Sequence, residues 1–177
     1  MTTITVPTRD NVIESNKVLF DSLQKMVGFV PNVYAVFAHS PTALGDYLAL
    51  QNRKSSLTGK EREVVNLLVS QLNGCNYCKA AHTAIGKMMG FTEEQTQEIR
   101  RANITFDAKL NALAKVVKEI VENKGEVSGS TMKAFYHQGY TIENLVDVVI
   151  NVGDKIMTNY MFALAKVPID WPTPQAI

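Results

Sequence analysis

Apolar residues recur along this chain at intervals of three or four positions, which is the spacing of one face of an α-helix. Two of the clearest stretches run from Val12 to Met26 and from Leu110 to Val121. No stretch of useful length alternates between apolar and polar residues, as a half-buried strand would. The pattern therefore predicts an all-α fold.

Residues typical of helix ends divide this pattern into separate helices. Thr58 with Glu61, and Thr92 with Gln95, have the spacing of a capping box, in which side chain and backbone satisfy each other's free donors. Glycines at which helices can end follow three of the stretches: Gly28, Gly90 and Gly139. The predicted helices cover residues 10–27, 32–38, 41–55, 59–73, 75–89, 93–101, 107–123, 130–138 and 142–165, and a Pro-rich tail, VPIDWPTP, follows them.

The length of the chain favours one domain. It has 177 residues, of which 46% are hydrophobic, and this is enough for one well-buried core but too short for two large domains. We therefore expect a single helical domain over residues 1–177.

A weak internal repeat accompanies the helical pattern. Residues 63–80 can be laid over residues 143–160 with their apolar positions in register, which points to an old helical duplication. The second copy lacks cysteine, so only the first can carry thiol chemistry. Three residues of the second copy fall opposite Cys75, Cys78 and His82, in that order: Lys155, Thr158 and Phe162.

Charge and hydropathy exclude several classes of partner. The chain has 18 Lys and Arg against 17 Asp and Glu, and it has no run of like charges. This balance offers no electrostatic footprint for nucleic acid or for an anionic membrane. The N-terminal sequence has no basic region followed by an apolar segment, and no apolar run approaches the roughly 18 to 20 residues of a membrane span. We therefore expect a cytoplasmic protein without nucleic-acid or membrane partners.

The only two cysteines, Cys75 and Cys78, lie in one short segment with His82. The preceding Asn73-Gly74 breaks a helix and places Cys75 in the first turn of the next, where free N–H groups and the helix dipole stabilise a thiolate. All three side chains lie on one helical stripe, with Cys78 and His82 as an i, i+4 pair. The two cysteine Cα atoms would be roughly 5 Å apart, which suits a cycle between dithiol and disulfide.

A carboxylate of the preceding helix can complete this cluster. Glu63 is the freer candidate, because Glu61 is already the capping partner of Thr58. If the two helices pack antiparallel, Glu63 can orient His82 or accept a proton through it, as the third group does in an activated nucleophile.

The residues alone leave other interpretations open. Cys75 and Cys78 could be small core residues, or they could bind zinc with His82 and Glu63, although no second Cys/His pair supports a zinc site. His82 could be a satisfied core histidine and Glu63 a solvated helix charge. The same scaffold could also be a non-peroxidatic disulfide-exchange or ligand-binding protein. The helix start favours Cys75 as the more acidic thiol, whereas the neighbouring imidazole favours Cys78.

The spacing of Glu63, Cys75, Cys78 and His82 resembles the signature of the AhpD-like alkylhydroperoxidases within the carboxymuconolactone decarboxylase family. The similar core runs over about residues 57–106. The segments GFVPNVYAVFAHSP and KVPIDWP resemble the peroxidase-related branch. The family's decarboxylase branch lacks the cysteine pair, so its lactone chemistry transfers poorly to this chain.

This resemblance implies an all-helical homo-oligomer, a trimer or hexamer, that reduces organic hydroperoxides or hydrogen peroxide without haem, flavin or metal. Cys78 would be deprotonated by a relay through His82 and Glu63, would attack the peroxide and would become a sulfenic acid. Cys75 would then form the disulfide. A dithiol such as dihydrolipoamide would restore the pair, and a peroxiredoxin is a further expected partner.

Overall fold

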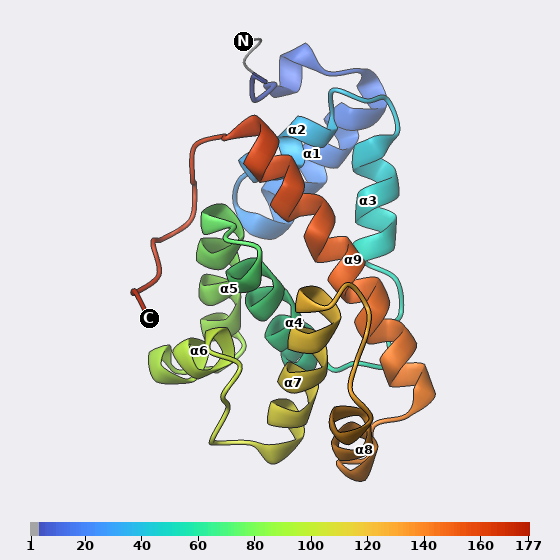
Figure 1. Cartoon of the computed structure of the whole chain (residues 1–177). Helices are drawn as coiled ribbons and strands as arrows, with labels where there is room; N and C mark the ends of the chain where they lie inside the picture. The colour runs from blue at the N-terminus through green and yellow to red at the C-terminus, as the bar shows by residue number, and fades with distance from the viewer. Residues whose placement is uncertain (1–3) are drawn as a thin grey trace. The chain divides into compact units, whose positions relative to one another are not determined.

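The computed structural model describes residues 4–177, and every regular element in this range is helical (Figure 1). The all-α prediction is confirmed. In chain order the elements are η1 (Arg9–Asn11), α1 (Glu14–Val27), α2 (Asn32–Phe37), α3 (Ala43–Gln51), α4 (Gly59–Leu72), α5 (Asn76–Met88), α6 (Glu93–Arg100), α7 (Ala108–Glu122), α8 (Gly129–His137) and α9 (Ile142–Ala165).

Most helices begin and end close to the predicted positions. The Thr58 and Thr92 capping boxes are both present, at the starts of α4 and α6. Gly28 has a φ of 92° and ends α1 in the left-handed region, which only glycine adopts without strain. The predicted helix over 10–27 is too long at its start, because Arg9–Asn11 form a separate 3-10 turn.

The described residues group into two units, which we consider separately. One contains the chain up to Arg53 together with Tyr160–Asp170, and the other contains Lys54–Asn159 together with Trp171–Ile177. The first unit has its own apolar core from α1, α2 and α3, which includes the fully buried Leu44. The single domain expected over the whole chain stays a prediction.

The second unit is built around α4. This helix packs against α5, α6 and α7, and its residues from Glu63 to Ser70 are buried without interruption. A helix with apolar residues on every side must be covered on every side, and the run Val64, Val65, Leu67, Leu68, Val69 meets this condition. The polar residues of α4 are therefore held inside the unit, where their partners fix their orientation.

The longest described helix, α9, has 24 residues. It continues without a break where the proposed first copy of the repeat ends one helix and begins another, so the two copies differ in local structure. Part of its surface carries exposed apolar side chains: Ile142, Val146, Val149 and Met157. Within residues 4–177, no helix has the length and apolar character that a bilayer crossing requires.

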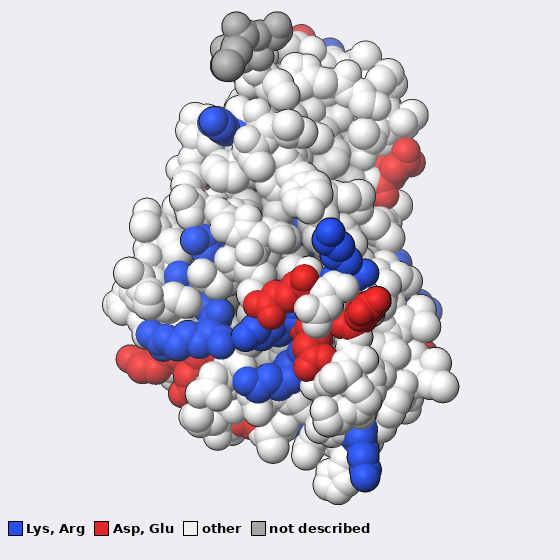
Figure 2. Space-filling view, in the orientation of Figure 1, with Lys and Arg blue, Asp and Glu red and all other residues white. Residues whose placement is uncertain are grey.

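Charged side chains of both signs occur together on the molecular face in Figure 2. Lys and Arg side chains there lie next to Asp and Glu side chains. This mixture agrees with the net charge of +1 for the whole sequence. The view shows no broad region of a single sign on that face.

Candidate active site

The turn between α4 and α5 places the two cysteines. Gly74 has a φ of 66°, a conformation in which a Cβ would be strained even though no atom lies within 4 Å of its ideal position. Cys75 then has extended backbone angles and is the N-cap of α5, so the prediction that it lies in the first helical turn is wrong by one residue. Its Sγ accepts a hydrogen bond from the backbone N–H of Cys78 at 3.2 Å. The thiol group therefore lies beside the free N–H groups of the helix, as the sequence indicated.

Cys75 and Cys78 form a disulfide, with their Cα atoms 5.3 Å apart. This separation agrees with the roughly 5 Å expected for such a pair and lies inside the disulfide range of about 4.4 to 6.8 Å. Each cysteine is only 3% exposed. The pair can thus be oxidised at its present backbone positions, and a reactant that meets it must be small or must enter the protein.

His82 and Glu63 form a buried pair across α5 and α4. The Nδ1 atom of His82 lies 2.8 Å from Oε2 of Glu63, and the two residues are 7% and 6% exposed. Because a carboxylate oxygen can only accept at this distance, Nδ1 carries the hydrogen and donates it, which leaves Nε2 free to take up a proton. The contact expected from antiparallel packing of the two helices is therefore present, and it sets the tautomer that a general base requires.

The second oxygen of Glu63 also has a partner. Nδ2 of Asn66 donates to Oε1 of Glu63 at 2.8 Å, and Nδ2 of Asn151 donates to Oδ1 of Asn66 at 2.7 Å. Since its oxygen is already occupied by Asn151, the Asn66 amide must turn its NH₂ group toward Glu63. Both carboxylate oxygens are thus satisfied inside the protein, which is the usual condition for a buried carboxylate.

Burial and neighbouring charges adjust this pair for proton transfer. Burial and the positive charge of Lys155 lower the pKa of His82, against the opposing effect of Glu63. Burial acts to raise the pKa of Glu63, but the charge of His82 and the hydrogen bonds from His82 and Asn66 outweigh it and lower that pKa. Near neutral pH the glutamate is therefore ionised and the imidazole neutral, as a base and its orienting carboxylate should be.

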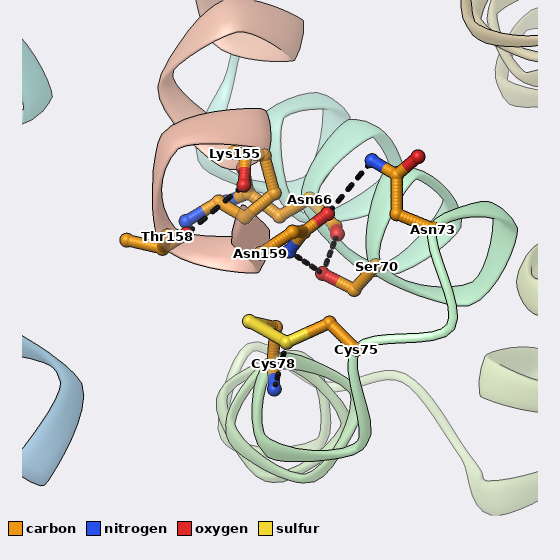
Figure 3. Close-up of a disulfide and its surroundings, with 8 residues drawn as sticks. All are labelled: Asn66, Ser70, Asn73, Cys75, Cys78, Lys155, Thr158 and Asn159. Carbon is orange, nitrogen blue, oxygen red and sulfur yellow. Dashed lines mark hydrogen bonds between the residues drawn. A yellow bond between two sulfur atoms is a disulfide. The ribbon is translucent and has the colours of Figure 1, made fainter. Parts of the chain in front are cut away.

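A row of polar residues on α9 lies over the segment of α4 that contains Asn66 and Ser70 (Figure 3). Nδ2 of Asn73 donates to Oδ1 of Asn159 at 2.9 Å, and Nδ2 of Asn159 lies 3.5 Å from Oγ of Ser70. Between Asn151 and Asn159 of α9 lies Lys155, which is 1% exposed. Sequence reasoning placed this lysine only in the repeat, opposite Cys75, and gave it no role in the site. The signal that could have found it is a lysine in the apolar stretch of a helix, at a spacing of four from Asn151 and Asn159.

The zinc interpretation finds no support in residues 4–177. Within that range no three or more His, Cys, Asp and Glu side chains are grouped so that they could hold a metal ion. In the disulfide, moreover, neither cysteine presents a thiolate ligand.

The fold and the site together define a class of protein. It is all-helical and carries a redox-capable Cys-x-x-Cys pair together with a histidine and a glutamate. Residues 36–119, which include all four motif residues, match the model of the Carboxymuconolactone decarboxylase family. The matched region contains the whole motif and supports the family resemblance that the motif predicted. A segment of 43 residues is also 40% identical to the uncharacterized protein YdfG of Bacillus subtilis (strain 168), over 29% of that protein's length and 24% of this chain.

Solved structures share the fold over nearly the whole chain. An uncharacterized peroxidase-related protein from Silicibacter sp. TM1040 matches with a TM-score of 0.83 at 22% identity, over 94% of this chain and 91% of its own. An uncharacterized peroxidase-related protein from Ralstonia eutropha JMP134, described as an alkylhydroperoxidase AhpD core, matches with a TM-score of 0.84 at 22% identity. The match covers 96% of this chain and 95% of that protein. A variant of the debrominase Bmp8 in complex with 2,3,4-tribromopyrrole matches with a TM-score of 0.76 at 13% identity. The match covers 96% of this chain and 92% of that protein. At these identities the likeness establishes the fold, and the chemistry must come from the site.

Proposed function

We propose that this protein is a thiol-dependent hydroperoxide reductase that cycles between the Cys75, Cys78 dithiol and its disulfide. One observation carries the proposal: the disulfide lies on the helix whose His82 is paired at 2.8 Å with a buried glutamate. A disulfide that only strengthened the fold would not need a base of fixed tautomer one turn further along the same helix. The fold shared with two peroxidase-related proteins supports the same class of reaction.

The first half of the cycle oxidises Cys78. Its thiol gives a proton to Nε2 of His82, and the ionised Glu63 stabilises the imidazolium that forms. The thiolate attacks one oxygen of the peroxide, so that an S–O bond forms and the O–O bond breaks. The sulfur is left as a sulfenic acid, and the leaving alkoxide or hydroxide takes the proton from His82.

The second half joins the two sulfur atoms and then reduces them. The thiol of Cys75 attacks the sulfenic sulfur of Cys78, which forms the disulfide and releases water. The Cα separation of 5.3 Å in the oxidised protein means that this step needs little backbone movement. A dithiol reductant, of which dihydrolipoamide is the first to test, then exchanges with the disulfide and returns the two electrons.

The burial of both sulfur atoms favours small reactants. Because each cysteine is 3% exposed, we expect hydrogen peroxide or a small organic hydroperoxide as the oxidant. A reductant must deliver its dithiol on a small molecule or on a narrow arm, and a peroxiredoxin is a candidate downstream partner. We further propose a homo-oligomer, a trimer or hexamer, as the working form.

The assignment of roles to the two cysteines has a direct test. We assign the attack to Cys78 because it lies one turn from His82, although the N-cap position also stabilises a thiolate at Cys75. A dimedone-type reagent applied with one equivalent of peroxide should label Cys78 in Cys75→Ser and should label nothing in Cys78→Ser. Label found only on Cys75 would reverse the roles.

Turnover itself is tested with tert-butyl hydroperoxide and dihydrolipoamide, by following dithiol consumption. The native protein should turn over, and Cys78→Ser should lose activity to the uncatalysed rate. Met88→Ser is the matched control, because it removes an exposed sulfur atom from the same helix, and it should keep full activity. A native protein that forms the disulfide but consumes neither tert-butyl hydroperoxide nor hydrogen peroxide would overturn the peroxidase proposal.

A further inference from the structure

Lys155 is a buried cation that the proposed reaction cycle does not use. It is 1% exposed, and the ion pairs of the described residues do not include it. Lysine is rarely fully buried, because the ammonium group loses its hydration and normally needs a carboxylate in return. Because no ion pair of the described residues engages the ammonium group of Lys155, its charge is available to stabilise a further negative group placed near it.

Hydrogen bonds on either side fix where Lys155 lies. Asn151 and Asn159 are four residues before and four residues after it, so the three lie along one side of α9. Asn151 bonds Asn66 of α4 at 2.7 Å, and Asn159 bonds Asn73 at 2.9 Å. Lys155 is thus held over the C-terminal half of α4, and Figure 3 shows it among the residues that surround the disulfide.

We propose that Lys155 is a further functional residue of this site, whose ammonium group stabilises the thiolate of Cys78. In the reaction it is a positioning residue: it exchanges no proton, and it favours the charged form of the sulfur atom that attacks. The part of the inference that concerns peroxide rests on the proposed function. There, as the S–O bond forms and the O–O bond breaks, the negative charge passes from sulfur to the leaving oxygen. His82, not Lys155, supplies the proton to that oxygen.

The electrostatics of the neighbouring groups agree with this role. Lys155 acts to lower the pKa of both His82 and Glu63, so its charge is felt at the pair that we propose to serve Cys78. Asp154, the next residue of α9, acts on the pKa of His82 in the opposite direction but more weakly than Lys155. Asp154 is 4% exposed, and its Oδ1 has no hydrogen-bond partner among the described residues.

The other charged groups near Cys78 belong to α5 and α6. Lys79 follows Cys78 in the chain, and burial, together with the positive charge of Arg100, lowers the pKa of Lys79. Arg100 itself donates to Oε1 of Gln71 and to the backbone oxygen of Gln175. Lys79 is only partly buried and Arg100 is 6% exposed, so Lys155, at 1%, is the most buried of the three cations and its substitution should remove the least screened charge.

The experiment titrates a single thiol. The sequence has two cysteines, so in the Cys75→Ser protein Cys78 is the only one, and its ionisation can be followed by absorbance at 240 nm and by the rate of iodoacetamide alkylation from pH 4 to 10. Lys155→Met should raise the pH of half-ionisation by about 1 to 2 units, which is the usual effect of one nearby charge. The alkylation rate at pH 7 should fall by roughly tenfold as the thiolate fraction falls.

Three comparisons separate this role from a structural one. Lys155→Arg keeps the charge, so the half-ionisation pH of Cys78 should stay within a few tenths of a unit of the parent value. Lys155→Gln removes the charge and should raise that pH as Lys155→Met does. Lys118→Met removes an exposed lysine of α7 and should change nothing. An unchanged half-ionisation pH in folded Lys155→Met or Lys155→Gln would overturn the proposal. So would half-ionisation of the parent at or above about pH 8.5, the ordinary value for cysteine.

The outcome is independent of peroxide turnover. A half-ionisation pH that rises in Lys155→Met, in a protein that consumes no peroxide, would reject the peroxidase proposal and support the role of Lys155. Peroxide turnover with an unaltered half-ionisation pH would support the peroxidase proposal and reject the role of Lys155.

Discussion

Replacement of Glu63 by glutamine tests the buried pair most directly, because it keeps the shape of the side chain and removes its charge. Both carboxylate oxygens accept hydrogen bonds, one from Nδ1 of His82 and one from Nδ2 of Asn66, each at 2.8 Å. A glutamine has one acceptor and one NH₂ group, so it can serve only one of these donors as long as His82 keeps its hydrogen on Nδ1. Asn66 cannot turn over to help, because its oxygen accepts from Asn151.

The expected loss of stability follows from that unsatisfied donor. A buried donor without a partner costs about 1–3 kcal/mol, so Glu63→Gln should lower the free energy of unfolding by that amount in urea denaturation at pH 7. The difference should depend on pH. The pKa of Glu63 is lowered from 4.5 in the folded protein, so its stabilisation is fully present above pH 4.5 and is lost as the pH falls through the folded pKa.

The same substitution should impair catalysis by a separate route. Without the carboxylate, the imidazolium of His82 loses its stabilising charge, and the contribution of a general base is typically 10²-fold to 10⁴-fold. We therefore expect the peroxide-dependent rate to fall by roughly 10²-fold or more. Glu122→Gln, which alters an exposed carboxylate of α7, should change stability by less than about 0.5 kcal/mol. A Glu63→Gln protein with native stability and native rate would refute the argument.

Three further predictions follow from other features of the structure. Gly74→Ala should lower the free energy of unfolding by about 1 kcal/mol in urea, because of the positive φ at this residue, whereas Gly129→Ala should not destabilise the protein; equal effects would contradict this. Protonation of His82 should leave more than half of the maximal peroxide-dependent rate at pH 6.5, because the pKa of His82 is lowered below its ordinary value, and a fall to half already at pH 7.5 in a pH–rate profile would argue against it. Sedimentation equilibrium should give a threefold or sixfold multiple of 19.6 kDa, and a monomeric mass would reject the oligomer.

The sequence was sufficient to predict the helical class and the cluster because both depend on local spacing. Apolar periodicity defines helices, and a capping box such as Thr58 with Glu61 is complete within four residues. The stripe of Cys75, Cys78 and His82 needs only the geometry of one helix. Glu63 was found because its helix immediately precedes theirs and a short turn makes the two antiparallel.

Contacts distant in sequence were not predictable in the same way. Asn66 and Asn151 are 85 positions apart, and no periodicity links a polar residue of α4 to one of α9. Lys155 was missed for the same reason: its burial depends on the packing of α9, and in the sequence it resembles an ordinary helix lysine. Cys75 was predicted in the first turn of α5 and is instead its N-cap, because Gly74 takes up the turn with its positive φ.

The short span of the disulfide separates the chemistry of this protein from its folding. Cys75 and Cys78 are three positions apart, so the bond closes a ring of only four residues. By the chain-entropy relation, such a small ring restrains the unfolded chain by about 2 kcal/mol, compared with about 4.7 kcal/mol for a loop of 100 residues. A protein whose fold depended on a long-range disulfide would loosen whenever that bond was reduced. In the proposed redox cycle, electrons would therefore pass in and out of this protein while the helices keep their places.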